Sequence, residues 1–176
     1  VSSVNFEITV NTNPVISAPT ALELCDYNNP GGQTEIFTLE DASAEILGGI
    51  TGVTLTFHEL LVDAESAMNV ITSPYNNTIN PQTVYARVED DTTGCFSTTT
   101  LDLIVNALPI SNTDPADLIL CDDDNAGNAT EIFDLTLNEA YILNGEAGVT
   151  ATYHESLSDA ENGTGAITVP TAYNNT

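Results

Sequence analysis

Three cysteines are the residues of this chain whose type and spacing most directly suggest a chemistry. Cys25 and Cys95 lie 70 residues apart, and Cys121 lies 96 residues after Cys25. A bond between the first two would close a long loop and contribute about 4 kcal/mol through loop-closure entropy. We therefore predict a Cys25–Cys95 disulfide and an oxidising, extracellular setting. The alternative is a pair of unrelated buried thiols. The partner of Cys121 would fall near position 191, outside the chain.

An acidic turn after Cys121 is the second candidate site. Two aspartates at its first and third positions, with glycine at the sixth, are spaced like the start of a calcium loop. Position twelve is Phe133 rather than an acid, so the turn is not an EF-hand. The alternative is an Asx-rich β-turn in which Asp134 caps the following helix. Calcium is the one cofactor considered, and its candidate ligands are Asp122, Asp124, Asn125 and Asp134, with a weaker set, Asp26 and Asn28, in the earlier turn.

The only histidines occur in two His-Glu pairs, His58-Glu59 and His154-Glu155. No second histidine or nearby cysteine completes a zinc or acid-base site, so a structural pair at a strand edge is the favoured interpretation. No nucleophile elbow or phosphate loop is present, and we expect no catalysis in this stretch. Tyr75-Asn76-Asn77 recurs in both halves of the chain, which favours a structural corner over a sugar-binding rim. Four sequons, at Asn76, Asn128, Asn162 and Asn174, are interpreted as turns.

The elements that carry these residues repeat. The stretch 25–65 returns as 121–161 without a gap, and the copies agree at 23 of 41 positions. The offset of 121 − 25 = 96 residues fits a compact all-β module better than a short solenoid repeat. The Tyr-Asn-Asn motif recurs at an offset of 173 − 75 = 98 residues, which predicts an insertion of two residues after Glu161.

The repeat divides the chain into three parts. Residues 1–14 correspond to the last strand of a preceding repeat, because the alternation of apolar residues that ends at Asn11 matches the one that ends at Asn106. Residues 15–109 form a complete repeat. Residues 110–176 form a second repeat that stops before its last two strands.

Strand and turn signals predict the fold of each repeat. Apolar residues alternate over 53–57 and again within 95–105, and turn signals separate six or seven short strands at intervals of about 8 to 12 residues. A short helix is predicted over 40–47. The predicted fold class is therefore all-β, with tandem immunoglobulin-like antiparallel β-sandwich modules that each contain a short helix. The tryptophan that packs on the disulfide of antibody domains is missing.

The charge balance narrows the choice of partners. The chain has 26 acidic residues, one arginine and no lysine, for a net charge of −25. Such a surface repels nucleic acid and anionic lipid. The high negative charge favours a solvated surface that repels other copies of itself, and the alternative is that some of the acidic residues bind calcium. The absence of lysine excludes Lys-Asn isopeptide crosslinks. No apolar stretch is long enough to span a membrane, and no signal peptide is recognised at the start of the sequence.

A series of short motifs runs through both repeats. In chain order they are Leu-x-Cys-Asp, an Asn/Asp/Gly turn, Ile-Phe-x-Leu, Val-Thr-x-Thr-Phe/Tyr-His-Glu, Asp-Ala-Glu, Pro-x-Tyr-Asn-Asn-Thr, Val-Tyr-Ala-Arg-Val, Gly-Cys-Phe and Leu-x-Leu-x-Val-x-x-x-Pro. Together they resemble the tandem repeat of very large surface proteins of Bacteroidota exported by type IX secretion, including gliding-motility adhesins. The resemblance covers essentially the whole chain. It implies an extended extracellular filament or stalk of immunoglobulin-like modules that carries adhesive or enzymatic tips.

We therefore expect a structural and adhesive module of a long, secreted cell-surface protein. The expected partners are neighbouring repeats, further copies in a fibre, and surface glycans or other cells contacted through other domains. Nucleic acid and membrane insertion are not expected. The alternative is a carbohydrate- or calcium-dependent binding module attached to a secreted enzyme. Many near-identical flanking repeats would favour the first function, and a single neighbouring catalytic domain the second.

Overall fold

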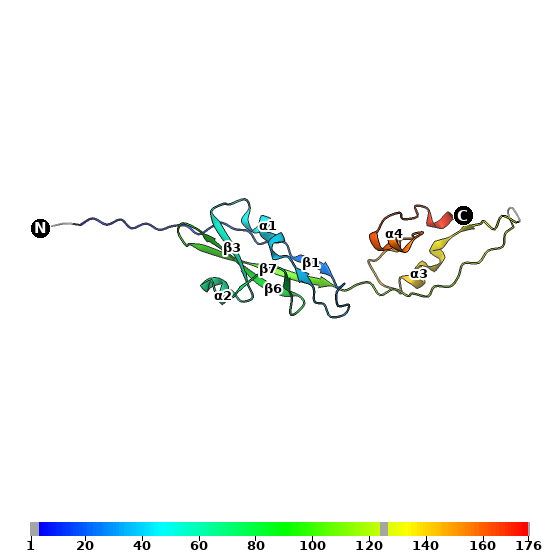
Figure 1. Ribbon diagram of the computed structural model, residues 1–176, viewed down its shortest axis with the longest axis horizontal. Coiled ribbons are helices and arrows are strands. Elements are labelled where there is room, and N and C mark those ends of the chain that lie inside the picture. The colour runs from blue at the N-terminus through cyan, green and yellow to red at the C-terminus, as the bar shows by residue number, and fades with distance from the viewer. Residues whose placement is uncertain (1–3, 124–126, 176) are drawn as a thin grey trace. The chain divides into compact units, whose positions relative to one another are not determined.

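The computed structural model describes residues 4–123 and 127–175. The chain divides into two compact units, Val1–Leu108 (unit 1) and Pro109–Thr176 (unit 2) (Figure 1). Among the described residues, no helix has the length and apolar character needed to cross a membrane.

Unit 1 is built on a five-stranded sheet with the strand order β1-β7-β6-β3-β4. The pairs β7·β6, β6·β3 and β3·β4 are antiparallel, as predicted. The pair β1·β7 is parallel, so the prediction of an antiparallel sheet is wrong at this edge. The strands are β1 (Leu22–Cys25), β3 (Val53–His58), β4 (Val70–Ile71), β6 (Gln82–Asp90) and β7 (Phe96–Asn106).

A second layer lies on one face of this sheet. It contains a two-stranded ribbon of β2 (Ile36–Phe37) and β5 (Tyr75–Asn76), followed in the chain after β2 by the 3₁₀ turn η1 (Leu39–Ala42) and the helix α1 (Ser43–Leu47). The predicted helix over 40–47 is thus confirmed as a 3₁₀ turn running into one short α-helix. The helix ends at Gly48, whose φ of +55° lies in the left-handed region that glycine adopts easily.

The core of unit 1 lies between these two layers. Alternate residues of β6 and β7 point to this face, and their burial follows from the two-residue period of a strand. The ribbon, η1 and α1 supply the opposing apolar side chains. The buried apolar residues that form this cluster are Phe37, Leu39, Ala42, Ile46, Phe57, Tyr75, Val84, Ala86, Val88, Leu101, Leu103 and Val105.

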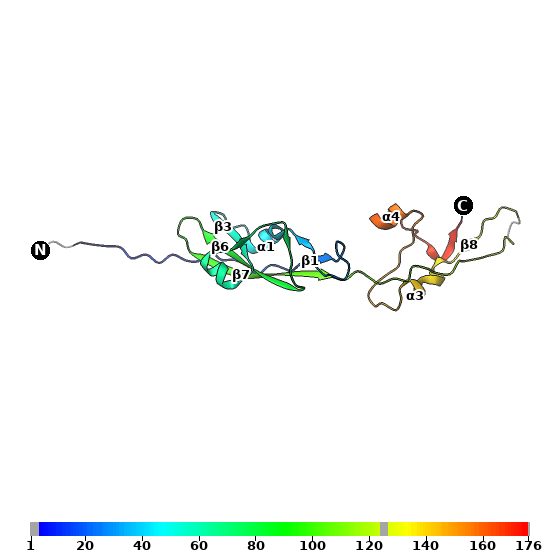
Figure 2. The same cartoon turned by 60° about the horizontal axis from the view of Figure 1, so that its bottom comes forward.

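The opposite face of the sheet carries the helix α2 (Leu61–Ser66). Figures 1 and 2 show α1 and α2 on opposite sides of the sheet. Arg87 points to this second face, because it alternates with the core residues Ala86 and Val88 along β6. The mainly β module with short helices is consistent with a β-sandwich, whereas the immunoglobulin-like assignment stays a prediction.

Unit 2 repeats the second layer of unit 1. Its ribbon pairs Ile132 with Asn174 and Phe133 with Tyr173, as the ribbon of unit 1 pairs Ile36 with Asn76. A 3₁₀ turn and a short helix follow the first ribbon strand, again as in unit 1. The elements are β8 (Ile132–Phe133), η2 (Leu135–Asn138), α3 (Glu139–Ile142), α4 (Leu157–Asn162), η3 (Pro170–Ala172) and β9 (Tyr173–Asn174).

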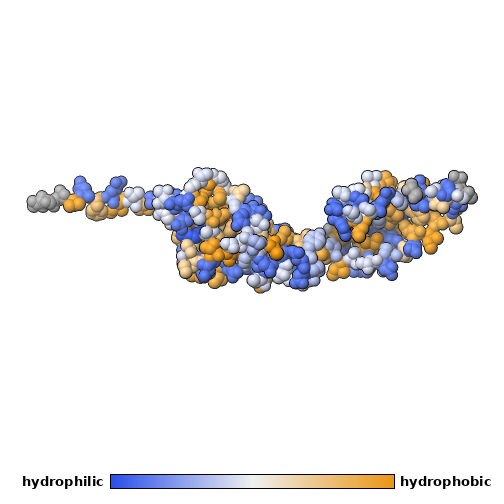
Figure 3. All heavy atoms as spheres, in the orientation of Figure 1, coloured by the Kyte–Doolittle hydropathy of each residue, from blue (hydrophilic) through white to orange (hydrophobic). Residues whose placement is uncertain are grey.

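Unit 2 differs from unit 1 in the layer that corresponds to the five-stranded sheet. The residues equivalent to β3, 149–154, form no strand, and within the described part of unit 2 no apolar side chain is fully buried. Apolar residues stay exposed there, as the orange atoms of Figure 3 show. The 176 residues hold no counterpart of β6 and β7 for this unit, and in unit 1 those strands supply half of the core.

Candidate functional site

Cys25 lies at the end of unit 1 from which the chain leaves. It is the last residue of β1, and its partner in the parallel neighbouring strand is Asn106, the last residue of β7. The N–H of Asp26 donates to the carbonyl of Asn106 (2.9 Å), which ties the turn after Cys25 to the end of β7. Cys25 is exposed. An accessible thiol therefore stands beside the point where the backbone leaves the sheet.

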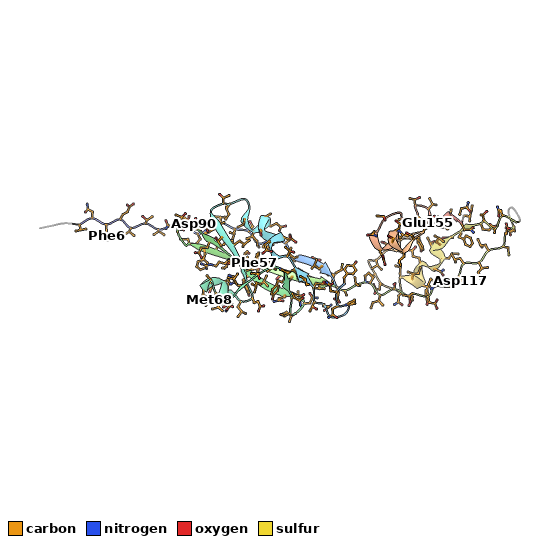
Figure 4. The ribbon with its side chains drawn as sticks, in the orientation of Figure 1. Phe6, Phe57, Met68, Asp90, Asp117 and Glu155 are labelled. Carbon is orange, nitrogen blue, oxygen red and sulfur yellow. The ribbon has the colours of Figure 1, made fainter. Side chains whose placement is uncertain are left out.

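Cys95 lies at the other end of the same sheet. It follows the turn between β6 and β7, where Gly94 has a φ of +71°. The Asp90 carboxylate accepts hydrogen bonds from the N–H groups of Thr93 (2.7 Å) and Thr92 (3.0 Å), and these bonds, that of Thr93 first, lower the pKa of Asp90. Figure 4 places Asp90 at the end of unit 1 where the N-terminal segment arrives. Cys95 is half-buried in this ordered turn.

The predicted Cys25–Cys95 disulfide is wrong. Cys25 lies beside the last residue of β7, and Cys95 precedes its first residue. An 11-residue strand rises by about 3.3 Å per residue, so the two cysteines are about 35 Å apart. A disulfide needs Cα atoms within about 7 Å. All three cysteines, Cys121 included, are free thiols in the structure.

The N-terminal segment enters unit 1 next to Cys95. Asn13 lines an open groove together with Glu65 and Cys95. The hydroxyl of Ser97 donates to the carbonyl of Pro14 (2.7 Å), which fixes the segment against the start of β7. The entry end of the unit is therefore the Cys95 end, and the exit end is the Cys25 end.

The acidic turn after each cysteine is closed by its first aspartate. In unit 1, Asp26 is only 1% exposed, and its Oδ2 accepts hydrogen bonds from the N–H groups of Gly31 (2.6 Å) and Gln33 (3.3 Å). Asp122 makes the equivalent two bonds in unit 2, at 2.6 and 3.2 Å. In both aspartates Oδ1 is buried without a hydrogen-bond partner in the described structure. Each aspartate thus closes the loop that follows it, through N–H groups five and seven residues further along the chain.

The described members of the predicted calcium set make hydrogen bonds within the protein. Asp134 accepts hydrogen bonds from the N–H and hydroxyl of the residue two positions on and caps η2, so the capping alternative is confirmed. The amide of Asn28 donates to Glu35 rather than presenting an oxygen to a shared site. Asp124 and Asn125 lie outside the described residues. Across 4–123 and 127–175, no group of three acidic, histidine or cysteine side chains is placed to hold a metal ion.

Asn77, in the recurring Tyr-Asn-Asn motif, joins three backbone segments. Its side-chain oxygen accepts a hydrogen bond from the N–H of Glu35 (2.7 Å), and its amide donates to the carbonyls of Gln33 (3.0 Å) and Ile79 (2.8 Å). The residue is 1% exposed. Asn175 repeats the first two bonds in unit 2, at 2.6 and 3.0 Å. The prediction of a structural corner is confirmed.

Glu35 completes this corner. Its carboxylate accepts hydrogen bonds from the N–H of Asn28 (2.7 Å) and from the Asn28 amide. The backbone bond from Asn28 is the main reason why the pKa of Glu35 is lowered. Glu131 accepts the N–H of Asp123 (3.1 Å) in the same way in unit 2.

The histidines are structural, as predicted, but not at a strand edge. His58 is fully buried in β3, which lies between β4 and β6. Its Nδ1 is 2.6 Å from the carbonyl oxygen of Met68 and its Nε2 is 2.9 Å from the hydroxyl of Thr56. His154 has the same two contacts, with the carbonyl of Thr164 and a threonine hydroxyl. Both ring nitrogens are therefore occupied within the fold.

Arg87, the only basic side chain, was missed by the sequence analysis. Its guanidinium donates to the carbonyls of Ala64 (3.0 Å) and Glu65 (3.3 Å) at the end of α2 and to the Glu89 carboxylate. It also stacks on the ring of Phe96 at 3.5 Å from the centroid. The signal in the sequence was the lone arginine in an otherwise acidic chain, because a buried cation must have partners.

These features define a β-rich tandem-repeat module. Its buried polar side chains stabilise the turns, and the thiols of Cys25 and Cys95 lie at opposite ends of the sheet of unit 1. The chain belongs to the Flavobacterium inter-domain disulphide bond domain family, whose model matches residues 21–109 and 117–176. No curated protein and no solved structure matches the chain. The family supports the coarser part of the resemblance, an extracellular domain of Bacteroidota.

Proposed function

We propose that this chain is a structural segment of a long extracellular protein, in which modules follow one another and are crosslinked through their cysteines. The observation that carries the proposal is the placement of Cys25 and Cys95 at opposite ends of one sheet, about 35 Å apart. A cysteine pair that staples a single module would lie together in it. Thiols at the entry and exit ends of a module are placed to form disulfides with the modules that precede and follow it.

Three further observations support this function. The family to which the chain belongs is named for disulfides between domains, and disulfides persist outside the cytosol, which fits the extracellular setting. The net charge of −25 keeps neighbouring surfaces apart and soluble. The buried polar side chains Asn77, His58 and Arg87 all bond to backbone groups of the module, as expected for a scaffold rather than a catalyst.

The finer proposal is that the parent protein is a cell-surface adhesin of Bacteroidota, exported by type IX secretion and used in gliding motility, with immunoglobulin-like modules forming its stalk. It rests on the motif resemblance alone. Surface glycans or other cells would be contacted by other parts of such a protein.

Surface labelling of the producing bacterium tests the proposed function. Antibodies against residues 15–109 should label intact cells, and protease added to intact cells should remove the signal. A periplasmic protein serves as the matched control and should be labelled only after lysis. If the antibody signal also appears only after lysis, the extracellular structural function is wrong. Electron microscopy of the released protein should show a thin filament of beads.

A further inference from the structure

Arg87 is the only position in this chain at which a protease of trypsin specificity can cut. The chain has one arginine and no lysine among its 176 residues. Proteases of this class bind a basic side chain in a pocket with a carboxylate at its base and cleave the peptide bond that follows. Unit 2 contains no lysine or arginine. Whether such a protease can cut the chain therefore depends on how unit 1 holds Arg87.

The backbone at Arg87 is paired on both sides. β6 is the middle strand of the five-stranded sheet, and Arg87 lies opposite Thr56 in β3 and Thr98 in β7. Proteolytic cuts concentrate at exposed loop tips and chain ends, where the backbone makes few hydrogen bonds. A protease can accept the segment around Arg87 only after both neighbouring strands have separated from β6. That separation also exposes the core residues that β6 carries, so it amounts to unfolding of unit 1.

The side chain of Arg87 is enclosed as well. The residue is 6% exposed, and its guanidinium donates a hydrogen bond to the carbonyl of Ala64 in α2 at 3.0 Å. The same group donates to the Glu89 carboxylate through Nε (3.1 Å) and lies over the ring of Phe96. The Arg87 side chain can enter a protease pocket only after these contacts are broken.

We propose that this chain resists proteases that cleave after lysine or arginine, because its one cleavage site becomes accessible only when unit 1 unfolds. When unfolding is fast and reversible compared with cleavage, the observed rate is the cleavage rate of the unfolded chain multiplied by the unfolded fraction. For a domain of ordinary stability that fraction is about one thousandth or less. A protein with this property persists where secreted proteases of this specificity are active. The inference goes beyond the structural function proposed above and depends neither on the location of the protein nor on its disulfides, so the two fail separately.

Digestion of the folded protein with trypsin tests the inference, with an exposed site in the same chain as the reference. Residues 4–10 are exposed and form no strand, so the Glu7→Arg protein carries a second, accessible cleavage site. Mass spectrometry distinguishes the products of the two cuts. Cleavage after position 7 should be at least about 100-fold faster than cleavage after Arg87. A smaller ratio would show that trypsin reaches Arg87 without unfolding of unit 1, and would overturn the inference.

A destabilised variant shows whether unfolding controls the cut. The side chain of Asn77 bonds to the backbone of Glu35, Gln33 and Ile79, none of which Arg87 contacts, so Asn77→Asp leaves the cleavage site itself unchanged. In the Glu7→Arg/Asn77→Asp protein, cleavage after Arg87 should accelerate by the same factor by which urea titration shows the unfolded fraction to rise. Cleavage after position 7 should keep its rate. An unchanged rate after Arg87, despite a larger unfolded fraction, would overturn the inference.

A glutamate-specific endoprotease is the control for general resistance to proteolysis. The wild-type chain offers it Glu7 in the exposed N-terminal segment. This enzyme should cut the folded wild-type protein under conditions in which trypsin leaves it intact. If the folded protein survives both enzymes equally, its resistance is not specific to proteases that require a basic residue, and the inference is overturned.

Discussion

Replacing Asn77 with aspartate tests whether this side chain holds the corner of unit 1. The substitution keeps the shape and the oxygen that accepts the N–H of Glu35, but it removes the amide that donates to Gln33 and Ile79. Two carbonyls then lose their donor and face a carboxylate oxygen. A buried carbonyl left without a partner costs about 1 to 3 kcal/mol. We therefore expect Asn77→Asp to lower the free energy of unfolding by about 3 to 5 kcal/mol at pH 7.

The chain contains its own control. Asn175 makes two of the three equivalent bonds in unit 2, but it is more exposed, so water can replace the lost donor. Asn175→Asp should cost about 1 kcal/mol or less. Urea unfolding followed by circular dichroism measures both, and the main transition reports unit 1, which holds all the fully buried apolar residues described.

Acidification gives a further check on Asn77→Asp. A protonated carboxyl group carries one O–H donor, so at low pH the introduced side chain can again donate to one of the two carbonyls. The loss in free energy of unfolding caused by Asn77→Asp should therefore be smaller at low pH than at pH 7. A loss in free energy of unfolding below about 1 kcal/mol at pH 7, or a loss equal to that of Asn175→Asp, would refute the role of the Asn77 amide in the corner.

Three more predictions concern charge. Arg87→Met should lower the free energy of unfolding by about 2 to 4 kcal/mol in thermal or urea unfolding, because the Ala64 carbonyl loses its buried donor and the Phe96 ring its cation. Arg87→Lys should restore less than half of this loss, because one ammonium group cannot reach the carbonyls of α2 and the Glu89 carboxylate together, and full restoration would contradict this explanation. The pKa of Glu35 is lowered in the folded protein, so its carboxylate contributes stability that is present above the unfolded pKa of about 4.3 and lost as pH falls through the lower folded pKa. In a pH series of urea titrations, the stability difference between wild type and Glu35→Gln should stay constant above about pH 5.5 and shrink below it, and a difference that grows on acidification would contradict this sign. Calcium followed by a chelator should move the unfolding midpoint of unit 1 by less than about 1 °C, because the carboxylates of Asp26 and Glu35 already accept hydrogen bonds from the backbone of the turn, and a shift of several degrees would contradict this.

The strands of unit 1 were the most predictable part of the fold. The alternation over 53–57 and within 95–105 became β3 and β7, because a strand with one buried face must alternate. The predicted strand at 22–25 also exists as β1. Its parallel pairing with β7 could not be predicted, since alternation reports which face is buried and carries no information on direction.

Polar side chains were harder to assign. The spacing of the acidic turn fits a ligand set, but Asp26 and Asp122 accept their hydrogen bonds from the backbone of the turn itself. A calcium loop and an Asx turn use the same residue types, so spacing alone could not separate them. The repetition of Asn77 as Asn175 did point to a corner, because a feature kept in both repeats serves what the repeats share.

Hydrogen bonds in unit 2 locate the two extra residues of the second repeat. The sequence comparison predicts a two-residue insertion after Glu161. The contact between His154 and Thr164 matches that between His58 and Met68, which keeps the offset at 96 up to this point. The N–H of Ile167 then donates to the carbonyl of Tyr153, as expected from the pairing of β3 with β4 in unit 1. The insertion therefore falls after Ile167, in the turn before β9.

The disulfide prediction failed because the number of residues between two cysteines does not determine whether they meet in the fold. Loop-closure entropy depends on how many residues separate two cysteines, and it favours any distant pair in one module. Strand direction decides whether such a pair can meet. Because β1 is parallel to β7, the cysteine that ends β1 lies at the finish of β7, and the cysteine before β7 lies at its start. The length of β7 therefore separates Cys25 from Cys95 within unit 1.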